Sequence, residues 1–322
     1  MKAIVCNSFG PIQDIEYKEI NEPIIEENSV IIDVKSIGVN FPDGLLVQGK
    51  YQLKPETPFT PGMEVAGNII KIGSNISKFK VGDKVVALSQ LGGYAEQALV
   101  KESSVFKIPE KMSFDDSCAL LCAYGTSHYA LKQRGNLKKD ETLVVLGASG
   151  STGIAAIQIG KIIGAKVIAV ASSEEKQKIA KEYGADIILG YDNLKEELKT
   201  LTDGKGVDVI FDPVGGEIFD TVARTMARKG RLLVIGFASG TIPKLAVNLA
   251  LVKEFSVVGV FWGAFARGEP QEYAGNMIEL FDWHQKGLVK PLIEDHYNLS
   301  DAAMVLEKIL GRGVKGKVIL NP

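Results

Sequence analysis

The stretch LVVLGASGSTG, residues 143–153, decides the fold of this chain. Four apolar residues that suit a buried strand lead into a turn where Gly147, Gly150 and Gly153 recur at every third position. Glycine at such a turn lets the backbone approach a phosphate, and the amides and dipole of the next helix stabilise its negative charge. The alternative is a Gly- and Ser-rich turn that only joins a strand to a helix, since such motifs also occur without a ligand.

The segment after the loop completes a strand–helix–strand unit. Thr142–Leu146 and Lys166–Ala171 are predicted strands with a helix over Gly153–Ile163 between them, which matches the length of about 30 residues expected of a dinucleotide-binding unit. The alternation continues with strands at Asp186–Leu189, Val207–Phe211, Arg231–Ile235 and Ser256–Val260, and helices at Glu174–Glu182, Leu194–Leu201, Glu217–Ala227 and near Ala246–Val252. Apolar strands that alternate with helices predict an α/β, doubly wound parallel sheet covered on both faces.

The first 120 residues are predicted to be rich in β-structure, because short apolar strands are separated by turns that contain Gly, Pro and Asp. The strands are Ser29–Ser36, Val65–Ile72 and Lys84–Leu88, with a turn at 92–96 before a further strand. A helix is predicted over Phe114–Arg134, with Ser113 as its N-cap and Gly125 as a candidate break. Helices at Gln271–Lys286 and Asp301–Leu310 and a strand at Gly316–Leu320 end the chain, and that strand is expected to return to the N-terminal domain.

Length and composition bound the class of protein. The 322 residues suggest two domains, which we place at 1–123 with 290–322, and at 124–289. A net charge of −2 does not favour nucleic acid or an anionic membrane as a partner. The three cysteines have the spacing of neither a disulfide framework nor a zinc ribbon, which favours a reducing compartment. Without a signal peptide or a long apolar run, we expect a cytoplasmic protein with no membrane span.

The end of the second strand of the dinucleotide unit indicates which cofactor is bound. A protein that binds NAD places Asp or Glu there, against the ribose hydroxyls. This chain instead has Ser172 and Ser173, with Lys176 one turn later. Two hydroxyls and a cation suit a 2′-phosphate and favour NADPH, although Glu174 and Glu175 lie close in sequence. The alternatives are a helix N-cap for Ser172 and a solvated helix face for Lys176.

Taken together, these features resemble the medium-chain dehydrogenase/reductase superfamily, and most of all its zinc-free NADPH:quinone oxidoreductase (zeta-crystallin-like) branch. The motifs that carry the resemblance are VNFPD at 39–43, PGMEVAG at 61–67, VGDKV at 81–85, the loop at 147–153 and DPVGG at 212–216. The resemblance spans essentially the whole chain. It implies a β-rich GroES-like catalytic domain at 1–123 and 290–322 and a Rossmann NADPH-binding domain at 124–289.

The resemblance also implies that the chain binds no metal. Zinc-dependent members of the superfamily use Cys, His and Cys as ligands, and these positions match Asn40, Met63 and Cys122 here. One thiol cannot form a catalytic zinc site, which needs three protein ligands. The structural zinc loop with four cysteines is also missing. Cys122 is then expected to be a small buried hydrophobic residue.

By the resemblance, Asn40 and Tyr51 lie near the nicotinamide and form the catalytic set. Asn40 would bind a carbonyl oxygen or the cofactor carboxamide, and Tyr51 would line the pocket or donate a proton; a turn residue and plain packing are the alternatives. Glu64 is expected to orient its neighbours, and Asp43 to cap the following helix or turn. The expected cofactor-binding residues are Thr126, Ser149, Gly150, Ser151, Thr152, Gly153, Ser172, Ser173, Lys176, Tyr191, Val214, Phe237, Phe261, Trp262 and Gly263.

The predicted activity is hydride transfer from NADPH to a quinone or another α,β-unsaturated carbonyl compound. Such an acceptor delocalises the charge left by the hydride and needs no zinc to polarise its oxygen. The alternatives are a 2-enoyl thioester (enoyl-CoA) reductase and a non-enzymatic NADPH-binding or structural protein. A homodimer is also expected, because the strand Ser256–Val260 would be an exposed apolar sheet edge in a monomer.

Overall fold

The computed structural model describes all 322 residues, which pack into two compact units. The β-rich unit comprises Met1–Cys122 and Pro291–Pro322, and the parallel-sheet unit comprises Ala123–Lys290. Each limit lies one residue from the domain boundary expected from the sequence. No helix in either unit has the length and apolar character that a membrane span requires.

A mixed sheet of seven strands forms the centre of the β-rich unit. Its path is β14 (Ile293–Asn298), β15 (Lys317–Asn321), β3 (Ser29–Val39), β4 (Glu64–Ile72), β5 (Lys84–Leu88) and β7 (Val105–Lys107), and β6 (Gln97–Lys101) also pairs with β3. β1 (Lys2–Val5) and β2 (Glu16–Glu19) form a separate antiparallel pair. Because β15 pairs antiparallel with β3, the last strand does return to the N-terminal part of the chain, as expected.

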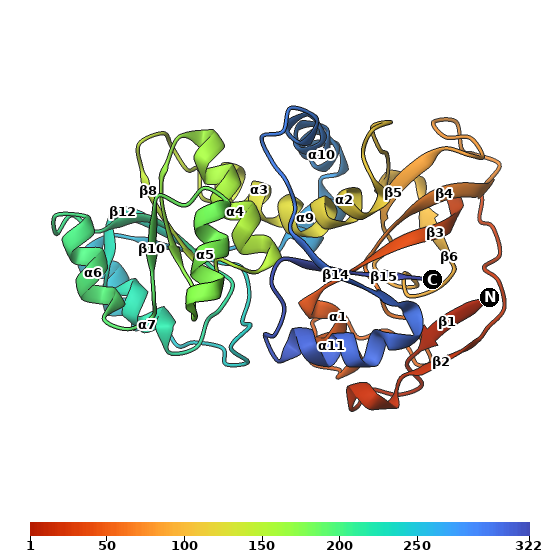
Figure 1. Ribbon diagram of the computed structural model, residues 1–322, viewed down its shortest axis with the longest axis horizontal. Coiled ribbons are helices and arrows are strands. Elements are labelled where there is room, and N and C mark those ends of the chain that lie inside the picture. The colour runs from red at the N-terminus through yellow and green to blue at the C-terminus, as the bar shows by residue number, and fades with distance from the viewer. The chain divides into compact units, whose positions relative to one another are not determined.

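Short helices cover this sheet, and the first of them packs against the last. α1 (Phe41–Val47) packs against α11 (Ala302–Leu310), as Figure 1 shows. Gly44 allows the close approach, because a side chain there would collide with Leu310. The 3₁₀ turns of the unit are η1 (Ile12–Asp14), η2 (Glu102–Ser104) and η5 (Leu299–Asp301). The N-terminus of α1 directly follows the last residue of β3, which pairs with the start of β15.

The long helix predicted over 114–134 is helical throughout but changes its winding. It consists of α2 (Phe114–Ala119), the π-helical η3 (Leu120–Tyr124), α3 (Gly125–His128) and the π-helical η4 (Tyr129–Arg134). Ser113 is the N-cap, and its hydroxyl accepts a hydrogen bond from the amide of Asp116. Gly125 does not break the helix. It leaves room for the indole of Trp262, which a side chain at this position would meet.

The parallel-sheet unit has the strand order of a doubly wound dinucleotide fold. The order is β10 (Ile187–Leu189), β9 (Lys166–Val170), β8 (Thr142–Leu146), β11 (Val207–Asp212), β12 (Met226–Val234) and β13 (Ser256–Gly259), with every pair parallel. The helices are α4 (Ser151–Ile163), α5 (Glu174–Glu182), α6 (Leu194–Leu201), α7 (Ile218–Ala223), α8 (Val247–Lys253), α9 (Trp262–Gly268) and α10 (Pro270–Gln285). Helices flank both sides of the sheet in Figure 1. The α/β class predicted from the sequence is therefore confirmed, and the topological switch point lies between β8 and β11.

The prediction of a helix over 217–227 was wrong at its C-terminal end. α7 ends at Ala223, and β12 begins at Met226 rather than at Arg231. Met226 pairs with Val207 across an irregular register, and Lys229 takes a φ of +64° at the irregularity. Sheet pairing with β11 thus outweighs the local preference of this segment for a helix.

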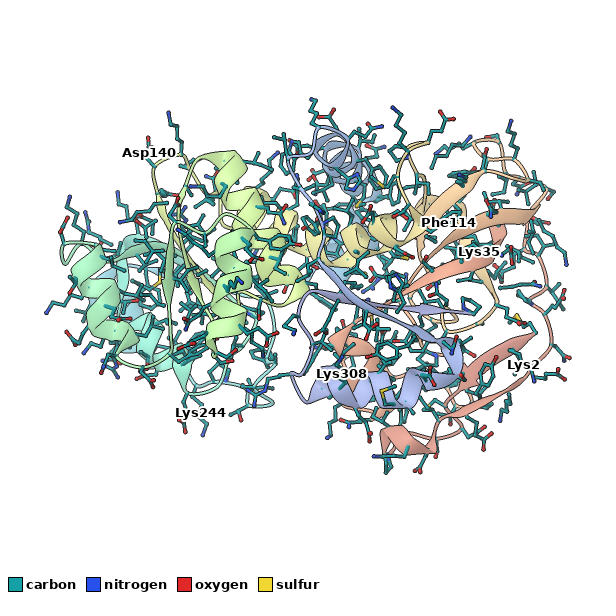
Figure 2. All side chains as sticks on the ribbon, viewed as in Figure 1. Lys2, Lys35, Phe114, Asp140, Lys244 and Lys308 are labelled. Carbon is teal, nitrogen blue, oxygen red and sulfur yellow. The ribbon has the colours of Figure 1, made fainter.

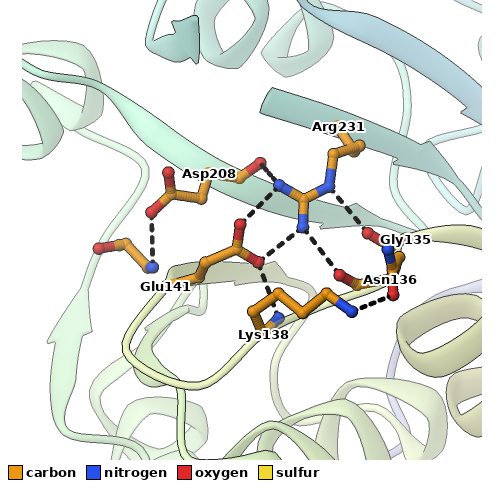
Figure 3. Close-up of polar contacts among 7 residues, drawn as sticks. Gly135, Asn136, Lys138, Glu141, Asp208 and Arg231 are labelled. Carbon is orange, nitrogen blue, oxygen red and sulfur yellow. Dashed lines mark hydrogen bonds and ion pairs between the residues drawn. The ribbon is translucent and has the colours of Figure 1, made fainter. Parts of the chain in front are cut away.

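A half-buried ion pair between Arg231 and Glu141 connects the amino ends of the central strands (Figure 3). The guanidinium of Arg231 donates to both oxygens of Glu141, at 2.9 and 2.6 Å, and also to the carbonyls of Gly135 and Asn136. Asp208 accepts from the amide of Thr142 at the start of β8. These contacts stabilise the edge opposite the carboxyl ends of the strands, where a doubly wound sheet binds its ligands.

Charged side chains of both signs project from the surface of each unit (Figure 2). Lys35 pairs with Asp33 at 2.8 Å and Lys2 pairs with Glu19 at 3.5 Å. Exposed pairs of this kind contribute about 0–1 kcal/mol each. The mixed signs agree with the net charge of −2.

Candidate functional site

The glycine-rich loop follows β8 at the carboxyl edge of the parallel sheet. Gly147 has a φ of +58°, a conformation that favours glycine. Its amide donates to the hydroxyl of Tyr191 at 3.1 Å, and its carbonyl accepts from the amide of Gly150 at 3.0 Å. The side chain of Val214 borders the space where a Cβ of Gly147 would stand. The structure thus brings Tyr191 and Val214, two residues expected from the sequence, to this loop.

Two glycines of the loop differ in what the fold demands of them. A side chain on Gly153 would collide with the carbonyl oxygen of Gly147, so helix–strand packing requires glycine there. Gly150 has an ordinary φ of −76°, and a Cβ there would meet only the carbonyl oxygen of Gly147, at 3.5 Å. The fold therefore does not require glycine at 150. A small residue at this position is what close approach of a phosphate to the backbone requires.

The start of α4 is suited to an anion. Gly150 is its N-cap, no side chain caps its first amides, and no acid lies in its first turn. Ser151, Thr152 and Gly153 form that first turn, and Ser149 before it is buried. The positive end of the helix dipole and amides without a side-chain cap are the usual elements of a pyrophosphate site.

At the end of β9, the alternative considered for Ser172, a helix N-cap, was wrong. The N-cap of α5 is Ser173, whose hydroxyl accepts from the amide of Lys176 at 3.4 Å, and not Ser172. Ser172 is exposed, and Lys176 lies on the first turn of α5. Glu174 and Glu175 are both exposed in that turn. Ser172, Ser173 and Lys176 lie together between the end of β9 and the first turn of α5.

The ends of β11 and β12 bring Val214 and Phe237 to the same edge. Asp212 accepts from the amides of Val214 and Gly215, at 2.8 and 2.9 Å, and so shapes the turn after β11. Burial raises the pKa of Asp212, and these two amides oppose the shift. Phe237 packs on Gly215, where a Cβ would lie 2.8 Å from its ring.

The residues of α3 and α9 that were expected around the nicotinamide differ in how far they are buried. Trp262 is buried against Gly125 and stands edge-on to Tyr273, with ring centres 5.5 Å apart. Phe261 is 49% exposed at the N-cap of α9, and Gly263 follows in the first turn. Thr126 is half-buried in α3. Its neighbour Ser127, which the sequence did not single out, donates to the carbonyl of Thr152 at 2.8 Å and anchors the start of α4.

In the β-rich unit, a buried polar cluster surrounds Asn40. The ammonium of Lys317 contacts a carboxylate oxygen of Glu64 and donates to the amide oxygen of Asn40 at 2.8 Å. The amide nitrogen of Asn40 donates to Glu64 at 3.0 Å and to the carbonyl of Gly38 at 3.2 Å. The other oxygen of Glu64 accepts from the amide of Cys122 at 2.9 Å. Glu64 thus orients its neighbours, as expected from the sequence.

Asp43 completes a capping box with Asn40 at the start of α1. One of its oxygens accepts from the amide of Asn40 at 2.8 Å and from the buried hydroxyl of Tyr94 at 3.0 Å. The other oxygen is buried without a hydrogen-bond partner. Burial raises the pKa of Asp43 to about 7, although both donors and Lys317 favour its charged form.

These residues do not fit a catalytic zinc ion. Asn40 is engaged in the cluster, Met63 offers a thioether at best, and Cys122 is buried. Burial, together with the charge of Glu64, raises the pKa of the Cys122 thiol well above its ordinary range, which disfavours the thiolate that binds metal. No group of three His, Cys, Asp or Glu side chains anywhere in the chain has the geometry of a metal site.

In the β-rich unit, Tyr51 was predicted from the sequence to be a site residue, whereas Lys317 was not. Tyr51 follows α1 and packs, half-buried, against the hydrophobic core. Lys317 was not singled out, although a signal was present: it starts the otherwise apolar segment KVIL at 317–320. A lysine at the buried end of an interior strand requires a buried acceptor, and Glu64 and Asn40 provide it.

A glycine-rich phosphate loop on a doubly wound sheet, joined to a β-rich unit, defines the class of nucleotide-dependent dehydrogenases and reductases. Residues 26–110 match the family model described as alcohol dehydrogenase GroES-like domain, and residues 151–283 match the one described as zinc-binding dehydrogenase. The ligand positions described above are those of a member without zinc.

Individual relatives narrow the class further. A quinone oxidoreductase-like protein 2 homolog from Nematostella vectensis is 37% identical, covering 99% of this chain and 88% of the relative. Quinone oxidoreductase from Homo sapiens is 34% identical, covering 99% and 97%. The crystal structure of Escherichia coli quinone oxidoreductase complexed with NADPH superposes with a TM-score of 0.93 at 27% identity, covering 100% of both chains. The chain belongs to the zinc-free quinone oxidoreductase branch of the medium-chain dehydrogenase/reductase superfamily.

Proposed function

We propose that this oxidoreductase transfers hydride from NADPH to a quinone or another α,β-unsaturated carbonyl compound. The observation that carries the proposal is the uncapped start of α4 beside Gly150, a glycine that the fold itself does not require. The NADPH complex of the Escherichia coli relative supports the choice of cofactor. The absence of an acid at the end of β9, where Ser172 and Ser173 stand, supports NADPH over NADH.

The chain's own residues divide the work of binding the cofactor. Bound NADPH supplies the hydride. The segment Ser149–Gly153 would bind the pyrophosphate through backbone amides and hydroxyls. Ser172, Ser173 and Lys176 would bind the 2′-phosphate. The remaining residues proposed to contact the cofactor are Thr126, Tyr191, Val214, Phe237, Phe261, Trp262 and Gly263.

The choice of acceptor follows from the donor set in the β-rich unit. Asn40, Met63 and Cys122 do not make a zinc site, so these positions offer no Lewis acid to polarise an alcohol or aldehyde oxygen. A conjugated acceptor spreads the charge left by hydride addition over its own atoms. Asn40 is proposed to act by hydrogen bonding and Tyr51 by lining the pocket or donating the final proton.

Single-turnover oxidation of bound NADPH, followed by its absorbance, tests the proposal. A simple quinone and an enone should each oxidise the cofactor faster than the uncatalysed reaction does. Rapid oxidation by an enoyl-CoA but not by quinones would show instead that the chain is a thioester reductase. Binding of NADPH without oxidation by any acceptor would show a non-enzymatic protein.

We also propose that the chain forms a homodimer through the edge of its parallel sheet. β13 is the last strand of the sheet and carries Val257 on a partly exposed face. α8, immediately before it in sequence, exposes Val247, Leu251 and Val252. An unpaired strand edge with apolar residues nearby favours pairing with a second copy.

A further inference from the structure

Gln158 is a buried polar side chain that the proposed reaction does not use. It is 8% exposed in the middle of α4, and its neighbours Ile157 and Ile159 are fully buried. A buried amide needs hydrogen-bond partners, because leaving its groups unpaired costs free energy. The partners of Gln158 therefore explain why a glutamine stands in this apolar helix.

Those partners lie near the two ends of the parallel-sheet unit. The side-chain nitrogen of Gln158 donates to the hydroxyl of Tyr124 at 2.8 Å and to the carbonyl of Lys290 at 3.1 Å. The side-chain oxygen of Gln158 accepts from the amide of Lys290 at 2.7 Å. The hydroxyl of Tyr124 in turn donates to the carbonyl of Lys290 at 3.0 Å. We call these three residues the Gln158 clasp.

The pattern of donors and acceptors fixes the orientation of the Gln158 amide. If the amide were reversed, its oxygen would face the carbonyl of Lys290 and its nitrogen would face the amide of Lys290, so two contacts would become repulsive. A glutamate of the same shape cannot donate a hydrogen bond when it is ionised, and a leucine offers neither a donor nor an acceptor. The clasp therefore depends on glutamine at this position.

The clasp stands where the chain passes between the two units. The chain crosses from Cys122 to Ala123 and returns from Lys290 to Pro291. Tyr124 is the second residue after the first crossing, and Lys290 is the last residue before the second. Tyr124 and Lys290 are 166 positions apart in the sequence. One side chain of α4 thus holds both ends of the parallel-sheet unit together.

On the other side of each crossing, the β-rich unit holds the chain by hydrogen bonds of its own. The amide of Cys122 donates to the carboxylate of Glu64 at 2.9 Å. The carbonyl of Leu292 accepts from the amide of Lys317 at 2.8 Å. Each crossing is therefore fastened on both sides.

The residues between the fastened positions are Ala123 and Pro291, and neither is a flexible linker. Ala123 lies within the π-helical turn η3, so its backbone belongs to a helix that continues through the crossing. The ring of Pro291 fixes its φ at about −65°, and a residue before proline, here Lys290, is restricted to extended conformations. Mobile linkers between domains are usually exposed, whereas Ala123 and Pro291 are both buried.

We propose that the Gln158 clasp is a conformational device that makes both crossings move as part of the parallel-sheet unit. It confines any reorientation between the units to Ala123 and Pro291. Loss of the clasp lengthens both links, because Tyr124 and Lys290 are then no longer held to α4. The proposal depends on neither the cofactor nor the acceptor, so it is tested on the full chain without them.

Distances between spin labels provide the first test. One nitroxide label is attached in each unit, at Lys101→Cys on β6 and at Lys199→Cys on α6, which are exposed positions, whereas the native cysteines are buried. With the clasp intact, electron double resonance should give one narrow distance distribution. Gln158→Leu should broaden it about twofold, because several backbone dihedrals at each crossing become free.

Gln133→Leu is the matched control for this measurement. Gln133 donates to Glu272 at 3.0 Å and accepts from Asn276 at 2.8 Å, within the parallel-sheet unit but at neither of its ends. This variant should keep the narrow distribution. A Gln158→Leu distribution as narrow as that of Gln133→Leu, or a broad distribution with the clasp intact, would overturn the proposal.

Hydrogen exchange of the wild-type protein decides the matter even if Gln158→Leu fails to fold. The amide of Lys290 should exchange slowly, because its hydrogen is bound by the side-chain oxygen of Gln158. In folded Gln158→Leu its exchange should be about 10-fold faster, the effect of losing one hydrogen bond, and in Gln133→Leu it should be unchanged. Exchange of the wild-type Lys290 amide at the rate of an unstructured peptide would overturn the proposal.

Discussion

At the scale of single residues, the environment of Asp43 makes the stability of the protein depend on pH. Both of its donors, the amide of Asn40 and the hydroxyl of Tyr94, bind the same oxygen, and the other oxygen is buried without a partner. Burial raises its pKa from 3.8 to about 7. The folded state therefore binds this proton more tightly than the unfolded chain does.

The sign of the effect on stability follows from this difference. Below the unfolded pKa both states carry the proton; as the pH rises toward the folded pKa, only the unfolded state loses it, and stability falls. The free energy of unfolding of the wild type, relative to Asp43→Asn, should decrease by at most about 4 kcal/mol between about pH 4 and pH 8. Chemical denaturation across this range measures it.

Asp186→Asn provides the control, with the opposite sign. Burial raises the pKa of Asp186, but the hydrogen bonds from Lys161 and the amide of Val167 outweigh it, so the net shift is downward. Its contribution is present above the unfolded pKa and is lost only as the pH falls below that value. A flat wild-type-minus-Asp43→Asn difference would contradict the assignment of Asp43.

Residue-level roles were predictable where the side chain acts locally. Asp43 was expected to cap the following helix, and it does so three residues after Asn40. Lys317 was not anticipated, because its partners Asn40 and Glu64 are brought to it by the pairing of β15 with β3 and of β3 with β4. Contacts across a sheet depend on strand register, which a single sequence does not determine.

At the scale of elements, the loop between β8 and α4 allows an effect on stability to be distinguished from an effect on cofactor binding. Gly150→Ala should lower stability by less than about 1 kcal/mol, the usual range for an N-cap change. The dissociation constant for NADPH should nevertheless rise about 10-fold or more, since a methyl group would stand where the phosphate approaches. Thermal melting and NADPH fluorescence titration measure the two effects. Unchanged NADPH affinity in a folded Gly150→Ala protein would remove the main support for the site.

The first turn of α5 tests the choice between the two nicotinamide cofactors. Lys176→Ala should weaken NADPH binding about 10-fold, the contribution of one charge-assisted hydrogen bond, and leave NADH binding unchanged. Lys178→Ala, exposed on the same helix, is the control and should alter neither. An equal loss for both cofactors would show that Lys176 does not bind the 2′-phosphate.

Several elements have the limits predicted from the sequence, among them the helices α5 and α6. β5 and β8 have the predicted limits because each is a short apolar run flanked by turn residues. The end of α7 was misplaced, because the segment from Met226 pairs with Val207 instead of continuing the helix. Local propensity gave the type of each element, whereas tertiary pairing decided where this one ended.

At the scale of the whole molecule, the proposed dimer makes a direct prediction. Leu251 is 78% exposed on α8, and Leu251→Glu should convert a dimer at micromolar concentration into a monomer in sedimentation experiments. Ile278→Glu, at an exposed apolar position on α10, is the control and should leave the assembly unchanged. A wild-type monomer under the same conditions would contradict the dimer itself.

The two-unit organisation was predictable at this scale because the alternation of strands and helices begins abruptly near residue 141. The return of the last strand to β3 was also expected and is confirmed. The identity of the acceptor was not, because it depends on side chains from many separate segments rather than on one motif.

The central claim is that the chain uses NADPH to reduce conjugated carbonyl compounds. A matched pair of acceptors tests it most directly: 2-cyclohexen-1-one, which is conjugated, and cyclohexanone, which is not. We predict that NADPH is oxidised with the enone, that the product is the saturated ketone, and that cyclohexanone gives no oxidation above the uncatalysed rate. Oxidation of NADPH with cyclohexanone at a comparable rate, or none with the enone and none with a quinone, would contradict the account.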